Sequence, residues 1–258
     1  MPELSPQEQA DALVHLLEDL CHVGVIPPFK THAEAMDQAA FLAAHCDVTF
    51  FVKTNWVDEP MNALMACCKY GISDELFHRM LERSDPRAPN ANGFTALMMA
   101  ACAEPELWLG FDSLGSLFSK SDQNAEDWHG RKAIHYAARQ PYDKVLKDFV
   151  RLGYSDLYYP DRNNAMLLIH AAQGALKHGS TECLDFLIER VDPRWGDRFG
   201  ESAASYCRQS SEPKVAGYAD KLESRGAVFA EREALLAESQ TKSCDDGSGE
   251  EVREDRRL

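Results

Sequence analysis

The sequence lacks the patterns by which common enzyme and metal sites are recognised. It has no Cys-x-x-Cys and no His-Glu-x-x-His, so the frequent zinc-binding arrangements are absent. It has no Gly-x-x-x-x-Gly-Lys-Ser/Thr loop, no Gly-x-Gly-x-x-Gly helix opening and no Gly-x-Ser-x-Gly elbow. We therefore expect no metal, no cofactor and no enzymatic activity.

Long apolar runs and an export signal are missing as well. No stretch of about 18 apolar residues occurs, so we expect no membrane-spanning segment. The opening residues, Met-Pro-Glu-Leu-Ser-Pro-Gln-Glu, contain neither a basic nor an apolar region of a signal peptide. The 8 cysteines are not spaced as a disulfide framework. We therefore expect reduced thiols and a cytoplasmic location.

Positive charge is scarce. The chain has 27 Lys and Arg residues against 42 Asp and Glu residues, a formal net charge of -15. Affinity for nucleic acid comes mostly from neutralisation of phosphates by Lys and Arg, so this balance disfavours nucleic acid as a partner. It disfavours an anionic membrane surface for the same reason. We therefore expect the partner to be another protein.

What the sequence does contain is a repeated unit. Its clearest copy runs from Asp127 to Ala138 and has the sequence Asp-Trp-His-Gly-Arg-Lys-Ala-Ile-His-Tyr-Ala-Ala. The Asp and the Gly predict a turn, and the small apolar residues that follow predict a short, closely packed helix. Apolar residues between Val145 and Val150 predict one face of a second helix, which Gly153 ends.

The turn and its first helix recur along the chain. Further copies begin at Asn90, Asp161 and Asp197, and an earlier degenerate copy lacks the Asp and the Gly. The copies recur every 33 to 37 residues, and a period of this size is typical of helical repeat arrays. The five first helices open at Asn62, Thr95, Lys132, Met166 and Ser202, in steps of 33, 37, 34 and 36 residues.

These residues resemble the ankyrin repeat, whose first helix opens Thr-Pro-Leu-His-x-Ala-Ala. Thr95 and Ser202 fill the Thr place, His135 fills the His place, and three copies keep the Ala-Ala pair, but no copy has the Pro. The resemblance covers about residues 57–228. It implies an all-α fold, an ankyrin-type helical repeat solenoid that binds partners on its concave face. Another helix-pair solenoid is the alternative.

The chain divides into three parts on this interpretation. Residues 1–56 contain two expected helices, about 5–22 and 31–46, and we expect a helical N-terminal cap, with a small separate interaction domain as the alternative. Residues 57–230 form an array of about five ankyrin-like repeats. Residues 231–258 are polar and acidic, and we expect a largely disordered tail because they cannot form a core.

A few side chains invite a catalytic interpretation. Cys67 and Cys68 are adjacent, and a dyad of one of them with a histidine is conceivable, but small buried residues on a packed helix explain them better. We expect His135 to bond backbone groups and not to act as a base. His170 stands one place later in its own repeat, and we assign it no role.

A binding surface is expected where the turn tips and the ends of the first helices align from repeat to repeat. We call this surface the turn-tip strip. It is rich in Arg and includes Trp, the residue types that dominate binding energy at interfaces. Its members are Asn92, Phe94, Trp128, His129, Arg131, Arg139, Gln140, Arg162, Asn163, Gln173, Arg198 and Phe199. The alternative is that the aromatic rings fold back over the neighbouring turn.

The turn-tip strip predicts a non-enzymatic protein-binding module. The strip is basic and aromatic, and we place the net negative charge on the cap, the outer helices and the tail, so a partner with an acidic or mixed patch fits. A chain without a catalytic domain suits a dedicated inhibitor or an immunity (antitoxin-like) protein. The alternatives are a general scaffold or adaptor and a secreted host-directed effector.

Overall fold

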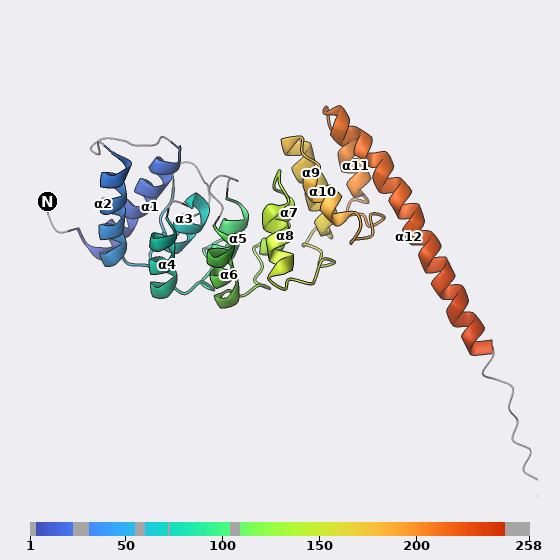
Figure 1. The fold of residues 1–258 in the computed structure, drawn as a ribbon, viewed down its shortest axis with the longest axis horizontal. Helices are drawn as coiled ribbons and strands as arrows, with labels where there is room; N and C mark the ends of the chain where they lie inside the picture. Colours follow the sequence, from blue (N-terminus) through green and yellow to red (C-terminus); the bar gives the residue numbers. More distant parts are fainter. Residues whose placement is uncertain (1–3, 23–30, 55–59, 72, 104–108, 246–258) are drawn as a thin grey trace, which may run out of the picture.

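The regular structure of the described chain is helical. The computed structural model describes residues 4–22, 31–54, 60–71, 73–103 and 109–245. This part of the chain holds twelve helices and no strands beyond two isolated β-bridges, so the expected all-α class is confirmed. The helices follow one another along a single axis, from α1 and α2 at one end to α11 and α12 at the other (Figure 1).

The helices pack as successive pairs. The first helices, α3, α5, α7, α9 and α11, each contact the next, and each also contacts its own second helix, α4, α6, α8, α10 or α12. One buried apolar cluster continues from Ala10 to Leu222 through these contacts. The bounds are α1 (Pro6–His22), α2 (His32–His45), α3 (Ala63–Tyr70), α4 (Asp74–Arg83), α5 (Ala96–Ala101), α6 (Phe111–Lys120), α7 (Ala133–Ala138), α8 (Lys144–Arg151), α9 (Leu167–His178), α10 (Glu182–Leu187), α11 (Ala203–Arg208) and α12 (Pro213–Asp245).

The first two helices cover one end of the row. The helices expected near 5–22 and 31–46 are present as α1 and α2, and Thr31 caps α2 with a reciprocal bond to Glu34. Helix α1 contacts α3, and α2 contacts α4. From α4, Arg79 donates to the Ala40 carbonyl of α2 at 3.2 Å and ties the two helices together.

The first helices begin where the sequence predicts. The N-cap side chains of Asn62, Thr95 and Ser202 each accept the backbone N–H three residues later. Asn62 departs from the Thr of the ankyrin pattern but makes the same capping bond, because its side-chain oxygen can accept it equally well. Every residue of α5 and of α7 is buried, as their small apolar sequences require.

The expectation of a disordered tail from residue 231 is wrong for residues 231–245, which continue α12 to Asp245. This segment contains several Glu, Ala and Leu residues and no Gly or Pro, so local propensity favours a helix where no core can form. Residues 246–258 lie outside the described residues. None of the described helices is long and apolar enough to cross a membrane.

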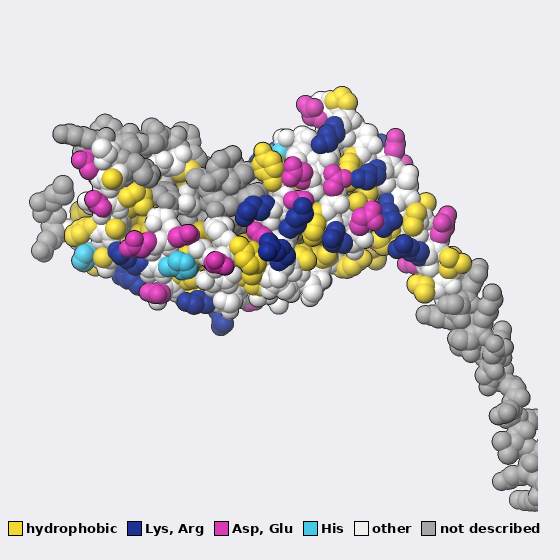
Figure 2. Space-filling model, in the orientation of Figure 1, with side chains coloured by type: hydrophobic (Ala, Val, Ile, Leu, Met, Phe, Trp, Pro, Cys, Tyr) yellow, Lys and Arg dark blue, Asp and Glu magenta, His cyan; other side chains and the backbone are white. Residues whose placement is uncertain are grey.

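Charge on the outer helices also differs from expectation. Figure 2 shows Lys and Arg side chains gathered over the middle and the C-terminal part of the face drawn, interspersed with Asp and Glu. Helix α8 carries Lys144, Lys147 and Arg151 against a single acid, Asp148. The expectation that the outer helices are negative is therefore wrong for α8. Asp148 accepts from both Lys144 and Arg151 and is buried between them.

Two neighbouring first helices approach each other closely at Gly174. A Cβ atom added to this residue of α9 would lie 2.5 Å from the carbonyl oxygen of Arg139, at the end of α7. No side chain fits at this distance without a shift of backbone. Gly174 therefore fixes where the last residues of α7 lie against α9.

We predict that Gly174→Ala destabilises the protein by about 1–3 kcal/mol, because the added methyl group forces the two backbones apart. Gly217→Ala in α12 is the matched control, since nothing lies within 4 Å of its added Cβ. That control should be neutral or gain up to about 1 kcal/mol from helix propensity. Urea unfolding measures both, and equal stability of the two variants would contradict the close approach.

Candidate functional site

The candidate site is built on turns that one carboxylate organises. Asp127 Oδ1 accepts the backbone N–H groups of His129 and Arg131, both at 2.8 Å. The Asp127 backbone closes the same turn by donating to the Arg131 carbonyl and accepting from the Gly130 N–H. Gly130 takes a φ of 71°, which a residue without a Cβ adopts at little cost.

The same arrangement recurs in three other turns. The side-chain oxygens of Asn90, Asp161 and Asp197 accept the backbone N–H groups two and four places later, at 2.8 to 3.0 Å. In the Asp161 turn the glycine place is taken by Asn164, with a φ of 60°. Asn is among the side chains that tolerate this region. Four turns therefore share one hydrogen-bonded geometry.

A side chain nine residues later holds the second oxygen of each aspartate. The three pairs are Asp127–Tyr136, Asp161–His170 and Asp197–Tyr206, with an O–O distance of 2.7 Å in the last. His170 Nε2 lies 3.3 Å from Asp161 Oδ2, at the place that a tyrosine fills in the other two. Sequence reasoning assigned His170 no role, although the recurrence of this spacing was a signal for one.

These bonds keep Asp161 and Asp197 ionised. Burial alone would raise the pKa of Asp161, but the bonds from His170 and from the Ala165 backbone lower it to about 2. Burial would likewise raise the pKa of Asp197, and the Tyr206 hydroxyl contributes to lowering it below its usual value. At neutral pH these carboxylates are charged, and their oxygens are occupied by bonds inside the turns.

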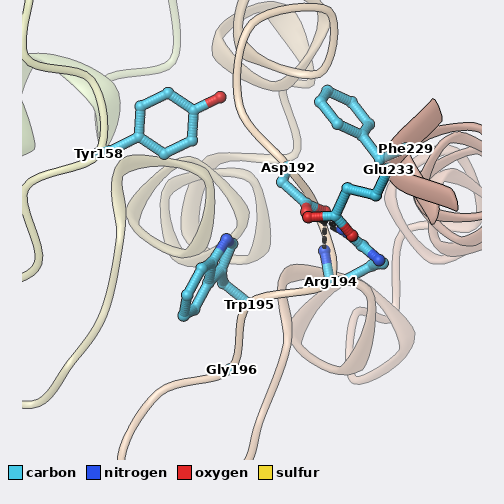
Figure 3. Close-up of a pocket in the computed structure, with 7 residues that line it drawn as sticks. All are labelled: Tyr158, Asp192, Arg194, Trp195, Gly196, Phe229 and Glu233. Carbon is cyan, nitrogen blue, oxygen red and sulfur yellow. Dashed lines mark hydrogen bonds and ion pairs between the residues drawn. The ribbon is translucent and has the colours of Figure 1, made fainter. Parts of the chain in front are cut away.

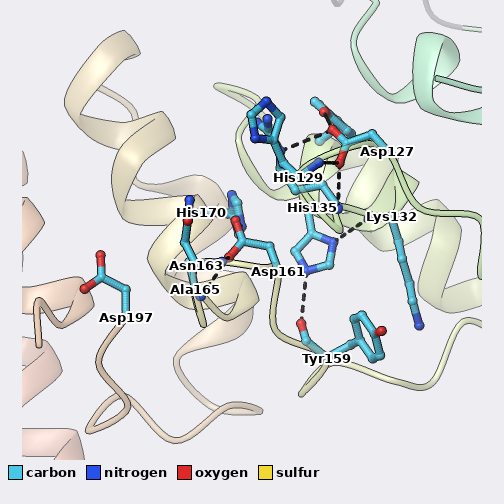
Figure 4. Close-up of polar contacts among 12 residues, drawn as sticks. Asp127, His129, Lys132, His135, Tyr159, Asp161, Asn163, Ala165, His170 and Asp197 are labelled. Carbon is cyan, nitrogen blue, oxygen red and sulfur yellow. Dashed lines mark hydrogen bonds and ion pairs between the residues drawn. The ribbon is translucent and has the colours of Figure 1, made fainter. Parts of the chain in front are cut away.

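Backbone bonds join each turn tip to the tip before it. Because donors and acceptors are both main-chain groups, the tips are held in fixed order whatever their side chains are. Figure 4 shows the turn aspartates of the last three turns in one row. The bonds run from Trp128 N to Asn92 O at 3.1 Å, from Arg162 N to His129 O at 2.8 Å, and from Arg198 N to Asn163 O at 2.7 Å.

His135 connects two backbone segments, as expected. Its Nδ1 accepts the Lys132 N–H at 2.9 Å, and its Nε2 lies 3.0 Å from the Tyr159 carbonyl, to which it donates in the matching tautomer (Figure 4). Burial and the neighbouring His170 ring, 4.9 Å away between centroids, lower the pKa of His135 to about 4. The ring is neutral at physiological pH, and both nitrogens are used by the fold.

Half of the predicted site residues meet in one pocket. It has a volume of about 190 Å³ and is lined by residues of the last three turns, of α9 and α11, and of the end of α7. The turn residues Asp161 and Asp197 line it together with Tyr206. The members of the turn-tip strip that line the pocket are His129, Arg131, Arg139, Asn163, Gln173 and Phe199.

Two aromatic side chains of the strip face solvent. Trp128 is 64% exposed and Phe199 is 69% exposed, so neither folds back over the neighbouring turn. The Arg198 guanidinium lies 4.7 Å from the centroid of the Phe199 ring and keeps that ring covered on one face only. These tips therefore present flat apolar surface from a rigid backbone.

Other members of the strip are used by the fold. Phe94 does fold back, and its ring packs 4.9 Å from that of Tyr136 between centroids. Gln140 donates to the Tyr136 carbonyl at 3.4 Å within the same turn of chain. Arg162 donates to the Trp128 carbonyl at 2.7 Å and so ties one tip to the next. Asn92 contributes the carbonyl that accepts from the Trp128 N–H.

The cysteines that invited a catalytic interpretation are buried. Cys67 and Cys68 lie inside α3, and burial raises the pKa of Cys67 to about 12. Every cysteine whose side chain the structure describes is a free thiol. Among the described residues, no group of three His, Cys, Asp or Glu side chains is placed to hold a metal ion.

Sequence reasoning missed a second pocket, beside α12. Tyr158, Trp195 and Phe229 surround a volume of about 550 Å³, and Trp195 is 50% exposed (Figure 3). Arg194 crosses the pocket and pairs with both Asp192 and Glu233. The available signal was Trp195 itself, a large apolar residue in the loop that precedes the fifth turn.

No protein-family model matches the chain, and no curated protein matches it.

The buried histidine predicts a dependence of stability on pH. The pKa of His135 is about 4 in the fold against 6.5 ordinarily, so the unfolded chain binds more protons between these values. The free energy of unfolding should therefore fall by up to about 3 kcal/mol as pH decreases through this window. In His135→Gln the fall should be smaller, with His170, whose pKa is also lowered by burial, supplying the remainder.

Denaturant unfolding at a series of pH values between about 7 and 4 measures this slope. Identical slopes in wild type and His135→Gln would contradict the assignment.

Proposed function

We propose that this chain is an ankyrin-type helical repeat solenoid that acts as a non-enzymatic protein-binding module. The paired helices, the repeated turns and the sequence resemblance support the solenoid. The turn-tip strip would be the binding surface, and its partner another protein. The net charge of -15 supports a partner other than nucleic acid.

The observation that carries this proposal is the exposure of Trp128 and Phe199. Each places a large ring mostly in solvent at a turn tip. A tip that served only as a connection would be occupied by small polar residues. Exposed aromatic groups beside arginines are the composition of interface centres.

The rigidity of the tips strengthens the argument. Binding loses affinity when loops must be ordered, and a surface that is already ordered avoids this cost. The backbones of Trp128 and Arg198 are each bonded to the preceding tip. The strip is therefore arranged before a partner arrives.

The mechanism of such a module is occupancy. By covering part of the partner's surface it would act as a dedicated inhibitor or an immunity protein, in a cytoplasmic setting that suits its reduced cysteines. The measurable difference from other roles is whether the partner's own activity falls on binding.

An adaptor is the second candidate, and one observation favours it. The aromatic pocket of Tyr158, Trp195 and Phe229 shares no lining residue with the pocket in the turn-tip strip. Two separate surfaces would let the chain hold two proteins at once. Trp195→Ala would then remove one partner and leave the other.

We predict that Trp128→Ala combined with Phe199→Ala abolishes capture of the partner. Truncating a central aromatic anchor typically costs about 2–4 kcal/mol, roughly 30- to 1000-fold in affinity. The fold should survive, because exposed substitutions usually change stability by about 0.5 kcal/mol or less. Affinity capture with quantitative mass spectrometry, together with a melting curve of the same variant, measures both effects.

Phe41→Ala provides the matched control, since Phe41 is 56% exposed but lies in α2 at the far end of the row (Figure 1). A protein captured by wild type and by Phe41→Ala, but lost from the double variant, supports the proposal. Retention by the double variant at wild-type strength would overturn it. Loss of the fold would assign the two rings a structural role.

A further inference from the structure

The pocket in the turn-tip strip contains hydrogen-bond donors that the fold does not use. Arg139 is half-buried, and none of the described residues forms a hydrogen bond or an ion pair with its side chain. Burial and the nearby charge of Arg131 lower its pKa. A guanidinium has five N–H donors and no acceptor, so an unpaired one is available to bind an anion.

The acidic residues of the same pocket are already engaged. Asp161 and Asp197 each accept two backbone N–H groups on one oxygen. The other oxygen of Asp197 accepts the Tyr206 hydroxyl, and that of Asp161 lies 3.3 Å from His170 Nε2. Arg131 is partly engaged, since its Nε lies 3.3 Å from Asp127 Oδ2 and its guanidinium carbon 5.3 Å from the centre of the Tyr136 ring. Arg139 is therefore the residue of this pocket whose side chain has no hydrogen-bond acceptor among the described residues.

Backbone packing fixes the position of Arg139. The Arg139 carbonyl lies against Gly174, where no side chain would fit. The guanidinium therefore starts from a rigid point at the end of α7. A donor group whose backbone is already fixed loses less entropy when it binds.

We propose that this pocket receives the carboxylate of an aspartate or glutamate side chain of the bound protein, with Arg139 as its main donor. The inference rests on the proposed function and names the chemistry that the partner presents. The planar guanidinium matches a carboxylate with two parallel bonds. Arg131 supplies the second positive charge.

Size and surroundings favour one side chain over a larger anion. At about 30 Å³ per water, a volume of about 190 Å³ holds roughly six waters, which is enough for a carboxylate and its short stem. Phe199 lines this pocket and is also exposed beside it. An acidic residue flanked by apolar residues would thus place its carboxylate in the pocket and its apolar neighbours against the Phe199 ring. The net charge of -15 disfavours a polyanion.

The direct test uses a matched pair of probes on the full chain. N-acetylglutamate amide carries one side-chain carboxylate, and N-acetylglutamine amide is its neutral isostere. Titration of each is followed through the arginine side-chain Nε–Hε signals by NMR. We expect saturable shifts of the Arg139 and Arg131 signals with the acid, and at least tenfold weaker binding of the amide. Equal response to both probes, or none to either, would overturn the proposal, as would tighter binding of inorganic phosphate.

Variants connect the pocket to the partner. Arg139→Gln should abolish the shifts and weaken capture about 10- to 100-fold, as expected when a charged hydrogen bond is lost. Arg139→Lys keeps the charge without the planar fork and should recover part of the affinity. Arg232→Gln, at an exposed arginine of α12, should behave as wild type. Melting curves check that each variant is folded.

The outcomes separate this inference from the proposed function. If capture depends on Trp128 and Phe199 but is unchanged in Arg139→Gln, the strip binds a partner and the carboxylate assignment is wrong. If capture does not depend on the two rings, the proposed function fails, and the probe titration still decides whether the pocket binds a carboxylate.

Discussion

The structure depends on one short-range interaction, the acceptance of two backbone N–H groups by a single side-chain oxygen in each turn. Asn90, Asp127, Asp161 and Asp197 all make it. Without it, two backbone N–H groups in each of the four turns would lose their acceptor inside the protein. With it, each tip has a defined shape, its backbone can bond the tip before it, and the first helices stack in order.

This interaction also explains how a surface of side chains can be rigid without being buried. Main-chain bonds hold the tips at Trp128 and Arg198, so their side chains are free to face solvent. The oxygens of the turn aspartates accept bonds inside the turns, and Arg139 is left without an acidic partner among the described residues. Exposed rings and an unmatched guanidinium are therefore consequences of the same architecture. On the proposed function, a carboxylate of the partner accepts the hydrogen bonds that Arg139 can donate.

Much of this fold could be predicted because its signals are local. Asp, Gly and small apolar residues in fixed order specify the turns and the first helices without long-range information. The side chains that contact the turn aspartates nine residues later were not predicted, because that contact forms only when the first helix folds back over its turn. They are Tyr136, His170 and Tyr206. Whether an aromatic side chain at a turn tip is exposed depends on residues distant in the sequence. Phe94 packs against the Tyr136 ring, whereas Trp128 remains mostly exposed. The extension of α12 to Asp245 was not predicted, because the absence of core residues was given more weight than the local preference for helix.

Amide hydrogen exchange at the turn tips tests the central claim most directly. The N–H groups of Trp128, Arg162 and Arg198 sit at exposed positions, yet each donates to the preceding tip. They should exchange as slowly as helix amides of the same repeats, opening only when neighbouring repeats separate. Exchange at the rate of an unstructured peptide would show that the tips move independently, and would contradict a binding surface arranged in advance.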